Sequence, residues 1–287
     1  MWIVLALASS IFAALTTILA KCGIKKTDST VATAIRTGVV MVFAWIMVFF
    51  AGSFHDIGNV EWKSWIFLIL SGFATGASWL CYFRALQLGE VNKVVAVDKS
   101  SIVFTLIFAF VILKEPFSSA KGIALILITA GTYLMVDWKK REQNAVHDPK
   151  WLLYALGSAV FAALTSILGK IGIEDVESNL GTAIRTVVVL VMAWIMVLAG
   201  GKKDQVRGIE KRELLFITLS GFATGASWLC YFKALHDGLA SVVVPIDKMS
   251  ILFVVIASAV IFKEKIWGKA LGGLVCIVAG TLLMIIA

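Results

Sequence analysis

Apolar runs of about twenty residues follow one another along the whole chain, and they restrict its fold more than any other feature. Each run is long enough to cross a hydrocarbon core of about 30 Å as a helix. Backbone groups in lipid must be satisfied within the segment, and strand-like alternation is absent, so the sequence predicts an all-α membrane protein with ten transmembrane helices. The runs lie near 2–20, 31–52, 64–87, 92–113, 118–137, 151–169, 180–200, 213–236, 241–262 and 267–286.

The composition leads to the same class of protein. Apolar residues make up 60% of the 287 residues and charged residues 15%, whereas soluble proteins average about 45–50% and about 25%. The first apolar run could be mistaken for a signal peptide. It has no basic segment before it, however, and it returns at 151–169, so we expect a retained helix.

The chain contains an internal repeat. A shift of 149 residues, without a gap, aligns 2–138 with 151–287, and about half of the aligned positions are identical. The segment SGFATGASWLCYF occurs at 71–83 and again, unchanged, at 220–232. Such self-similarity is typical of an architecture built by duplication. We therefore expect two copies of a five-helix unit.

An odd number of helices in each unit has a topological consequence. The units are expected at 1–138 and 151–287, joined by a basic cytoplasmic linker at 139–150, and the second must lie inverted relative to the first. Lysine and arginine are enriched in cytoplasmic loops. Seventeen of them fall on the side of the first helix's C-terminal end and five on the opposite side. This bias predicts that both termini are extracytoplasmic, in an inverted repeat of the kind that secondary transporters have.

Several motifs resemble those of EamA domains in the drug/metabolite transporter superfamily. Helices 4 and 9 close with LKEPFS and FKEKIW, and helix 3 closes with YFRALQLGEV. The resemblance implies a ten-helix, two-repeat transporter whose central cavity is built mainly from helices 1–4 and 6–9, with helices 5 and 10 at the periphery. Many ten-helix relatives have cytoplasmic termini, whereas the charge distribution here favours the reverse. Members carry amino acids, amines, nucleotide sugars and other metabolites, so the resemblance does not identify a substrate.

Charged residues inside the predicted spans are the main candidates for a substrate site. A charge at the bilayer centre costs at least about 2.5–3.5 kcal/mol, so such residues normally face a cavity or one another. The two units carry them at equivalent positions. They are Arg36, Asp98 and Lys99 in the first unit, and Arg185, Asp247 and Lys248 in the second.

Helical geometry suggests how these charges divide their roles. Asp98 and Lys99 point about 100° apart on a helix, and a buried carboxylate needs a partner. The expected pairs are Arg36–Asp98 and Arg185–Asp247. Lys99 and Lys248 are then free to bind an anionic or zwitterionic substrate, and sugar-phosphate carriers of the superfamily are similar in using basic residues on helices 4 and 9. The alternative is that all these charges are structural.

The repeated segment carries further candidates. Its glycines have the spacing that lets helices pack closely in lipid. Its aromatic residues lie three apart on one helical face, and they either anchor the helix at the interface or line the two mouths of a cavity. They are Trp79 and Tyr82 in the first unit, and Trp228 and Tyr231 in the second. Pro245 is expected to bend helix 9 and to act as a gate.

Several function classes are disfavoured. The three histidines and four cysteines show no metal-ligand or redox spacing, and no phosphate-binding loop occurs, so we expect no enzyme activity, metal or cofactor. The net charge of +8 lies in loops predicted to be cytoplasmic and indicates contact with membrane lipids, with no nucleic acid as partner.

The favoured function is secondary transport of a small polar metabolite, such as an amino acid, by alternating access through a central cavity. The alternative is a non-transporting membrane protein, either a receptor or an accessory subunit of lipid or cell-wall chemistry. The expected location is the plasma (inner) membrane of a prokaryote. The sequence leaves open whether the chain forms a homodimer.

Overall fold

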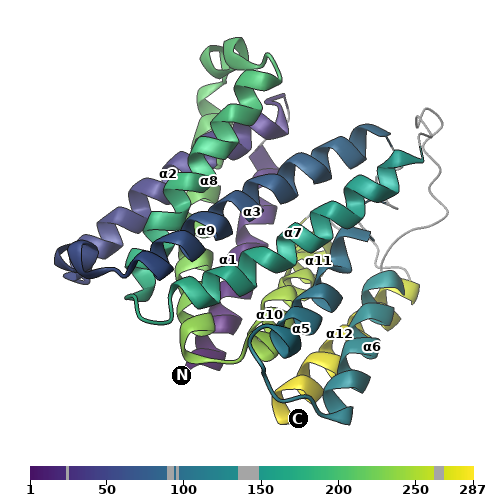
Figure 1. Cartoon of the computed structure of the whole chain (residues 1–287). Helices are drawn as coiled ribbons and strands as arrows, with labels where there is room; N and C mark the ends of the chain where they lie inside the picture. The colour runs from purple at the N-terminus through teal and green to yellow at the C-terminus, as the bar shows by residue number, and fades with distance from the viewer. Residues whose placement is uncertain (24–25, 89–93, 95–96, 135–148, 262–267) are drawn as a thin grey trace.

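A computed structural model describes residues 1–23, 26–88, 94, 97–134, 149–261 and 268–287 of the chain. Helices dominate it, and no strand occurs within these ranges (Figure 1). Two short 3-10 helices, η1 (Ser53–Asn59) and η2 (Lys203–Gly208), follow α2 and α8 at equivalent places in the repeat. The α-helices are α1 (Trp2–Gly23), α2 (Ser29–Phe50), α3 (Trp62–Leu88), α5 (Ser101–Val111), α6 (Ser119–Leu134), α7 (Lys150–Gly172), α8 (Ser178–Ala199), α9 (Lys211–Asp237), α10 (Ala240–Lys248), α11 (Ser250–Ile261) and α12 (Gly268–Ile286).

Seven of the described helical segments are long and apolar enough to cross a membrane. Six are α1, α2, α3, α7, α8 and α9, and the seventh runs through α10 and α11 over Ala240–Ile261. Two shorter apolar helices are α6 and the Leu271–Ile286 part of α12. The start of the fourth predicted span and most of the linker at 139–150 lie outside the described residues, and the count of ten spans stays a prediction.

The long helices have large apolar side chains outside and small ones inside. On α2, Val42 and Phe49 are exposed, whereas Ala34 and Ala44 are fully buried. Lipid solvates the large side chains as well as a protein core does, so helices in a membrane associate by close backbone approach over small residues. This pattern explains why the helices are apolar on every side and still pack in one arrangement.

The repeated glycines are where this close approach is tightest. A Cβ added to Gly72 on α3 would lie 2.6 Å from Val188 Cβ on α8. At the equivalent position, a Cβ added to Gly221 on α9 would lie 2.7 Å from Val39 Cβ on α2. Both distances are too short for any side chain, so these glycines are required for packing. The predicted role of the repeated glycines is confirmed.

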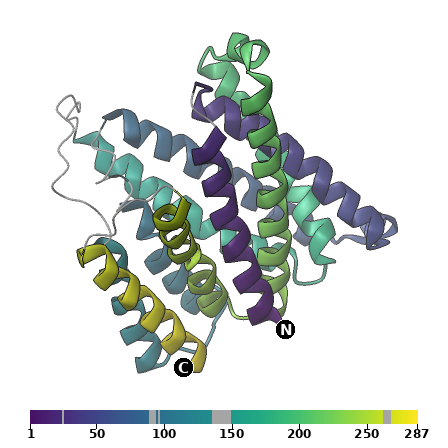
Figure 2. The ribbon, with the colours of Figure 1, turned by 180° about the vertical axis from the view of Figure 1, so that it is seen from behind.

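The contacts between the two units come in equivalent pairs. A contact made by a helix of one unit is repeated by the equivalent helix of the other unit. Helix α3 packs on α7, and its equivalent α9 packs on α1. Helices α2 and α8 pack on each other, as do α6 and α12, which lie side by side along one edge of the molecule (Figures 1 and 2). This pairing of contacts is the arrangement expected of a duplicated chain around a twofold axis. The orientation of the units in a membrane stays a prediction.

Among the polar contacts that join the loops of the two units, two occupy equivalent places in the repeat. Asp28 caps α2 with its side chain and accepts a hydrogen bond of 2.8 Å from Lys202 Nζ in the second unit. Its equivalent Glu177 caps α8 and accepts one of 3.0 Å from Ser53 Oγ in the first unit. Residues 53 and 202 are themselves equivalent in the repeat. The same tie is therefore an ion pair in one place and a hydroxyl–carboxylate bond in the other.

Candidate functional site

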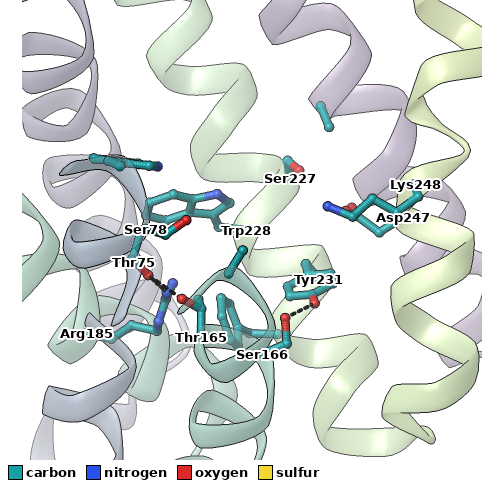
Figure 3. Close-up of a pocket in the computed structure, with 14 residues that line it drawn as sticks. Thr75, Ser78, Thr165, Ser166, Arg185, Ser227, Trp228, Tyr231, Asp247 and Lys248 are labelled. Carbon is teal, nitrogen blue, oxygen red and sulfur yellow. Dashed lines mark hydrogen bonds between the residues drawn. The ribbon is translucent and has the colours of Figure 1, made fainter. Parts of the chain in front are cut away.

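A cavity of about 290 Å³ lies where the two units meet. Its walls come from α1 and α3 of the first unit and from α7, α8, α9 and α10 of the second, and none of its lining residues belongs to α6 or α12. Figure 3 shows Arg185 on one side of the cavity, Asp247 and Lys248 on the other, and Trp228 and Tyr231 between them.

Asp247 and Lys248 sit at the end of a helix that breaks inside its predicted span. Helix α10 ends at Lys248, Met249 forms a turn by donating its N–H to the Ile246 carbonyl (3.0 Å), and α11 begins at Ser250. Met249 keeps a right-handed helical conformation (φ −62°, ψ −10°), so one tighter turn interrupts the helix and the span continues through α11.

The same break occurs in the first unit, where position 96, the equivalent of Pro245, is alanine. Ser100 donates its N–H to the Val97 carbonyl (3.0 Å), and α5 begins at the next residue. A proline disturbs the helical turn that precedes it, whereas this break follows Pro245 by four residues. Pro245 therefore does not account for this break, because the break belongs to both copies, and the expected bend and gate at Pro245 stay a prediction.

Each intramembrane aspartate accepts a hydrogen bond from a serine of the other unit. Ser158 Oγ on α7 donates to Asp98 Oδ1 (2.7 Å), and Ser9 Oγ on α1 donates to Asp247 Oδ1 (2.7 Å). The serines also pair across the α3–α7 and α1–α9 contacts. The distances are 3.3 Å between Ser78 Oγ and Ser158 Oγ, and 3.2 Å between Ser9 Oγ and Ser227 Oγ.

The predicted arginine–aspartate pairs, Arg36–Asp98 and Arg185–Asp247, are wrong. Arg185 Nη2 donates to Thr75 Oγ1 on α3 (2.9 Å), and Arg36 Nη2 reaches only Thr33 on its own helix (3.3 Å). Equal depth in the membrane did not make the partners neighbours. Helix α2 packs on α8 and α9, whereas the segment that holds Asp98 faces α7.

The two lysines approach each other between the units. Lys248 lines the main cavity, and Lys99 instead lines a second pocket of about 250 Å³ together with Thr132 and Tyr133. Both lysines line a small space of about 10 Å³ beside Ile102. Within the described ranges, no hydrogen bond or ion pair joins either lysine to another side chain.

The aromatic candidates divide between the cavity and a separate cluster. Trp79, Trp228 and Tyr231 line the cavity, and the Tyr231 hydroxyl lies 2.7 Å from Ser166 Oγ. Tyr82, the equivalent of Tyr231, is not among the lining residues and packs with other aromatic residues near the end of α3. The cavity is thus asymmetric, although the segments that line it are nearly identical.

Sequence reasoning missed the serines and threonines that connect the helices. Thr75 Oγ1 lies 3.2 Å from Thr165 Oγ1, and the equivalent pair, Thr16 and Thr224, has the same separation. The signal was present in the sequence, because small hydroxyl residues recur at equivalent positions inside four apolar spans.

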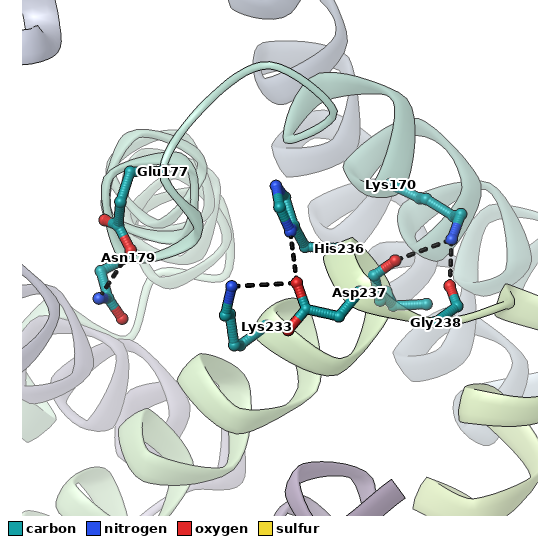
Figure 4. A network of polar contacts seen from close by, with 8 residues as sticks. Lys170, Glu177, Asn179, Lys233, His236, Asp237 and Gly238 are labelled. Carbon is teal, nitrogen blue, oxygen red and sulfur yellow. Dashed lines mark hydrogen bonds and ion pairs between the residues drawn. The ribbon is translucent and has the colours of Figure 1, made fainter. Parts of the chain in front are cut away.

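Two charged side chains fix the start of α10 and thereby the cavity wall. Glu115, in the LKEPFS motif, is buried and accepts hydrogen bonds from the first two backbone N–H groups of α10 (2.7 and 2.9 Å). A carboxylate there also favours the positive end of the helix dipole. Lys170 donates to the carbonyls of Leu235 (2.8 Å) and Gly238 at the end of α9, beside the cluster around Asp237 (Figure 4).

Long apolar helices in two equivalent units, with a polar cavity between them, define an integral membrane protein of the transporter class. The chain belongs to the EamA-like transporter family, whose model matches residues 1–137 and 149–286. This family assignment confirms the resemblance that the sequence motifs indicate.

Curated relatives are named as transporters and solute carriers. An uncharacterized transporter encoded in the cobO 3' region of a Sinorhizobium species is 44% identical over 134 residues, which are 47% of this chain and 95% of that protein. The human solute carrier family 35 member G1 is 30% identical over 224 residues, which are 75% of this chain. The matching part spans 60% of the human protein.

A solved crystal structure shares the fold. It superposes with a TM-score of 0.78 over 98% of this chain and 95% of that one, at 15% sequence identity. At this identity the likeness concerns the architecture alone.

Proposed function

We propose that this chain is a secondary transporter that moves a small anionic or zwitterionic metabolite by alternating access through the cavity between its units. The observation that carries the proposal is the position of the cavity. Equivalent residues of both units, Ser78 with Ser227 and Trp79 with Trp228, line it together. In transporters built from repeats, the substrate site lies at the interface of the repeats and is formed by broken helices.

The charges of the cavity wall support an anionic or zwitterionic substrate. Arg185 and Lys248 contribute two positive groups and Asp247 one negative group. The volume of about 290 Å³ lies at the lower limit of ligand sites, which commonly measure about 300–1,000 Å³. A substrate of metabolite size fits both the space and the charge.

The inverted arrangement of the two units, with both termini extracytoplasmic, is part of the proposal. The distribution of loop charges supports it. So does the packing of α3 on α7, which the equivalent packing of α9 on α1 repeats in the other unit. Helix α10, which carries Pro245 and ends at the break, is the candidate for the moving gate.

The experiment is uptake into liposomes that contain the purified protein, with a panel of amino acids, carboxylates, sugar phosphates and amines, with and without proton and sodium gradients. We expect flux of at least one anionic or zwitterionic compound, reduced by Lys248→Gln and Lys99→Gln. Lys269→Gln changes an exposed lysine on α12 in the same way and should have no effect. If folded protein moves none of these compounds, the non-transporting alternative is favoured.

A further inference from the structure

Arg185 is the largest fully buried side chain of the described residues, at 1% exposure. Its Nε donates to Ser71 Oγ (3.3 Å) and its Nη2 to Thr75 Oγ1 (2.9 Å), both on α3. Its Nη1 is buried and has no hydrogen-bond partner in the described part of the chain. The guanidinium is therefore held at one edge and left unsatisfied at the other.

The surroundings of this guanidinium do not neutralise its charge. Within the described ranges no carboxylate forms an ion pair with it. Its Cζ lies 4.2 Å from the ring centroid of Phe232 and 5.2 Å from that of Trp228. Ring faces attract a cation through the negative charge of the π-system. A buried charge normally requires an opposite charge as well.

The free edge of the guanidinium has the geometry of a carboxylate site. With Nε and one Nη2 donor engaged on α3, the donors that are left belong to Nη1 and to the remaining N–H of Nη2. These lie side by side, and such a pair matches the two oxygens of a carboxylate in a planar, bidentate contact. Arg185 lines the cavity, as Figure 3 shows.

We propose that Arg185 is the carboxylate-binding residue of the cavity, and that the transported metabolite is a small carboxylate. This inference rests on the transport function proposed above and names its substrate class. The remainder of such a ligand faces Tyr231 and Trp228, and its second polar group reaches Asp247 and Lys248 on the other side.

The repeat provides an internal comparison. Arg36 occupies the equivalent place in the same TAIRT sequence, and Ser220 and Thr224 are the equivalents of the two hydroxyls that hold Arg185. Neither accepts a hydrogen bond from Arg36, which is only partly buried and does not line the cavity. The free pair of N–H donors at Arg185 therefore depends on how α8 packs against α3, because the local sequence around Arg36 is the same.

The test measures ligand-induced thermal stabilisation of the purified full-length protein. The probes are pyruvate, succinate, L-serine and L-phenylalanine, each beside its amide, together with inorganic phosphate and putrescine. We expect at least one carboxylate, and not its amide, to raise the Tm. Arg185→Gln should weaken its binding by about 10- to 100-fold, the range for a hydrogen bond to a charged group. Arg185→Lys, which keeps the charge and loses the fork, should weaken it less.

The control is Arg84→Gln, the same substitution at an exposed arginine that, among the described residues, bonds to Gln87 on the same helix. It should leave binding unchanged. The inference is overturned if folded Arg185→Gln protein binds the carboxylate as tightly as the wild type, or if no carboxylate stabilises the wild type. If a carboxylate binds in an Arg185-dependent way and liposomes show no flux, the site stands and the transport function falls.

Discussion

Ser158 and Asp98 form one of the two serine–aspartate contacts that replace the ion pairs expected inside the membrane. A hydroxyl supplies one hydrogen bond without adding a charge, and the bond is strong when the acceptor is ionised. Within the described residues this leaves Arg185, which lines the cavity, without a carboxylate partner, as the proposed ligand site requires. At the scale of the residue, the partner of a charge depends on which helices touch, and not on depth alone.

A double-mutant cycle distinguishes the observed Ser158–Asp98 contact from the expected Arg36–Asp98 ion pair. Asp98→Asn and Ser158→Ala should be coupled by about 0.5–3 kcal/mol, because the residues are in contact, whereas Asp98→Asn and Arg36→Gln should add within about 0.3–0.5 kcal/mol. Unfolding free energies in detergent give both values. Strong coupling between Arg36 and Asp98 would contradict the contacts described for this site.

At the scale of the element, the repeated glycines set how closely helices of the two units approach. Gly72→Ala places a methyl group 2.6 Å from Val188 Cβ and 2.9 Å from the Arg185 carbonyl. Overpacking of this kind typically costs about 1–3 kcal/mol. We therefore expect a lower Tm for Gly72→Ala, measured on purified protein.

Gly272→Ala is the matched control, since no atom lies within 4 Å of an added Cβ there. Its Tm should equal or exceed that of the wild type, because alanine favours a helix over glycine. Equal losses in Tm at both positions would contradict the packing role of Gly72.

Glu115 acts on α10, the element proposed above as the gate. Removing a side-chain cap from a helix start typically costs about 0.5–2 kcal/mol, and Glu115 satisfies two N–H groups of α10. Glu115→Ala should therefore lower the Tm and increase hydrogen exchange of the first turn of α10. Glu61→Ala, at an exposed position, serves as control, and unchanged exchange in the Glu115 variant would argue against the cap.

The sequence predicts elements better than it predicts contacts between them. Helix positions follow from apolar length, and the packing role of Gly72 follows from small-residue spacing, since both depend on local pattern. The partner of Asp98 could not be obtained in this way, because it depends on the lateral order of helices. The turn after Lys248 was not predicted, and it occurs in both units although only the second has a proline nearby.

At the scale of the whole molecule, the tie between Asp28 and Lys202 joins the two units and depends on pH. Burial tends to raise the pKa of the Asp28 carboxyl, but hydrogen bonds from Lys202 and Thr30 and the nearby ammonium charge lower it below its ordinary value. A carboxyl whose folded-state pKa is lowered stabilises the fold above its unfolded-state pKa and loses this contribution as the pH falls.

The Tm difference between wild type and Asp28→Asn should therefore be largest near neutral pH and shrink below about pH 4, where aspartate titrates in unfolded chains. Thermal unfolding between acidic and neutral pH measures it. A difference that grows as the pH falls would have the wrong sign for this tie.

The proposed topology is a second prediction at this scale. With five spans in each unit and the basic loops in the cytoplasm, a cysteine introduced at Ala287 should react with a membrane-impermeant reagent added to intact cells. A cysteine at Lys203, in a basic loop on the opposite side, should react only after lysis. The reverse pattern would invert the assignment of both termini.

The docking of Arg185 on α3 bears on the balance between two conformational states. In the proposed alternating-access cycle, Arg185 releases its hydrogen bonds to Ser71 and Thr75 when the protein changes state. Arg36 can then form the equivalent hydrogen bonds to Ser220 and Thr224. In this cycle duplication would bring the two states closer in free energy, and the positions where the copies differ, among them Ser53 and Lys202, would tip the balance. A difference of a few kcal/mol would leave both states populated, so the empty protein would return readily between its two states after each release of substrate.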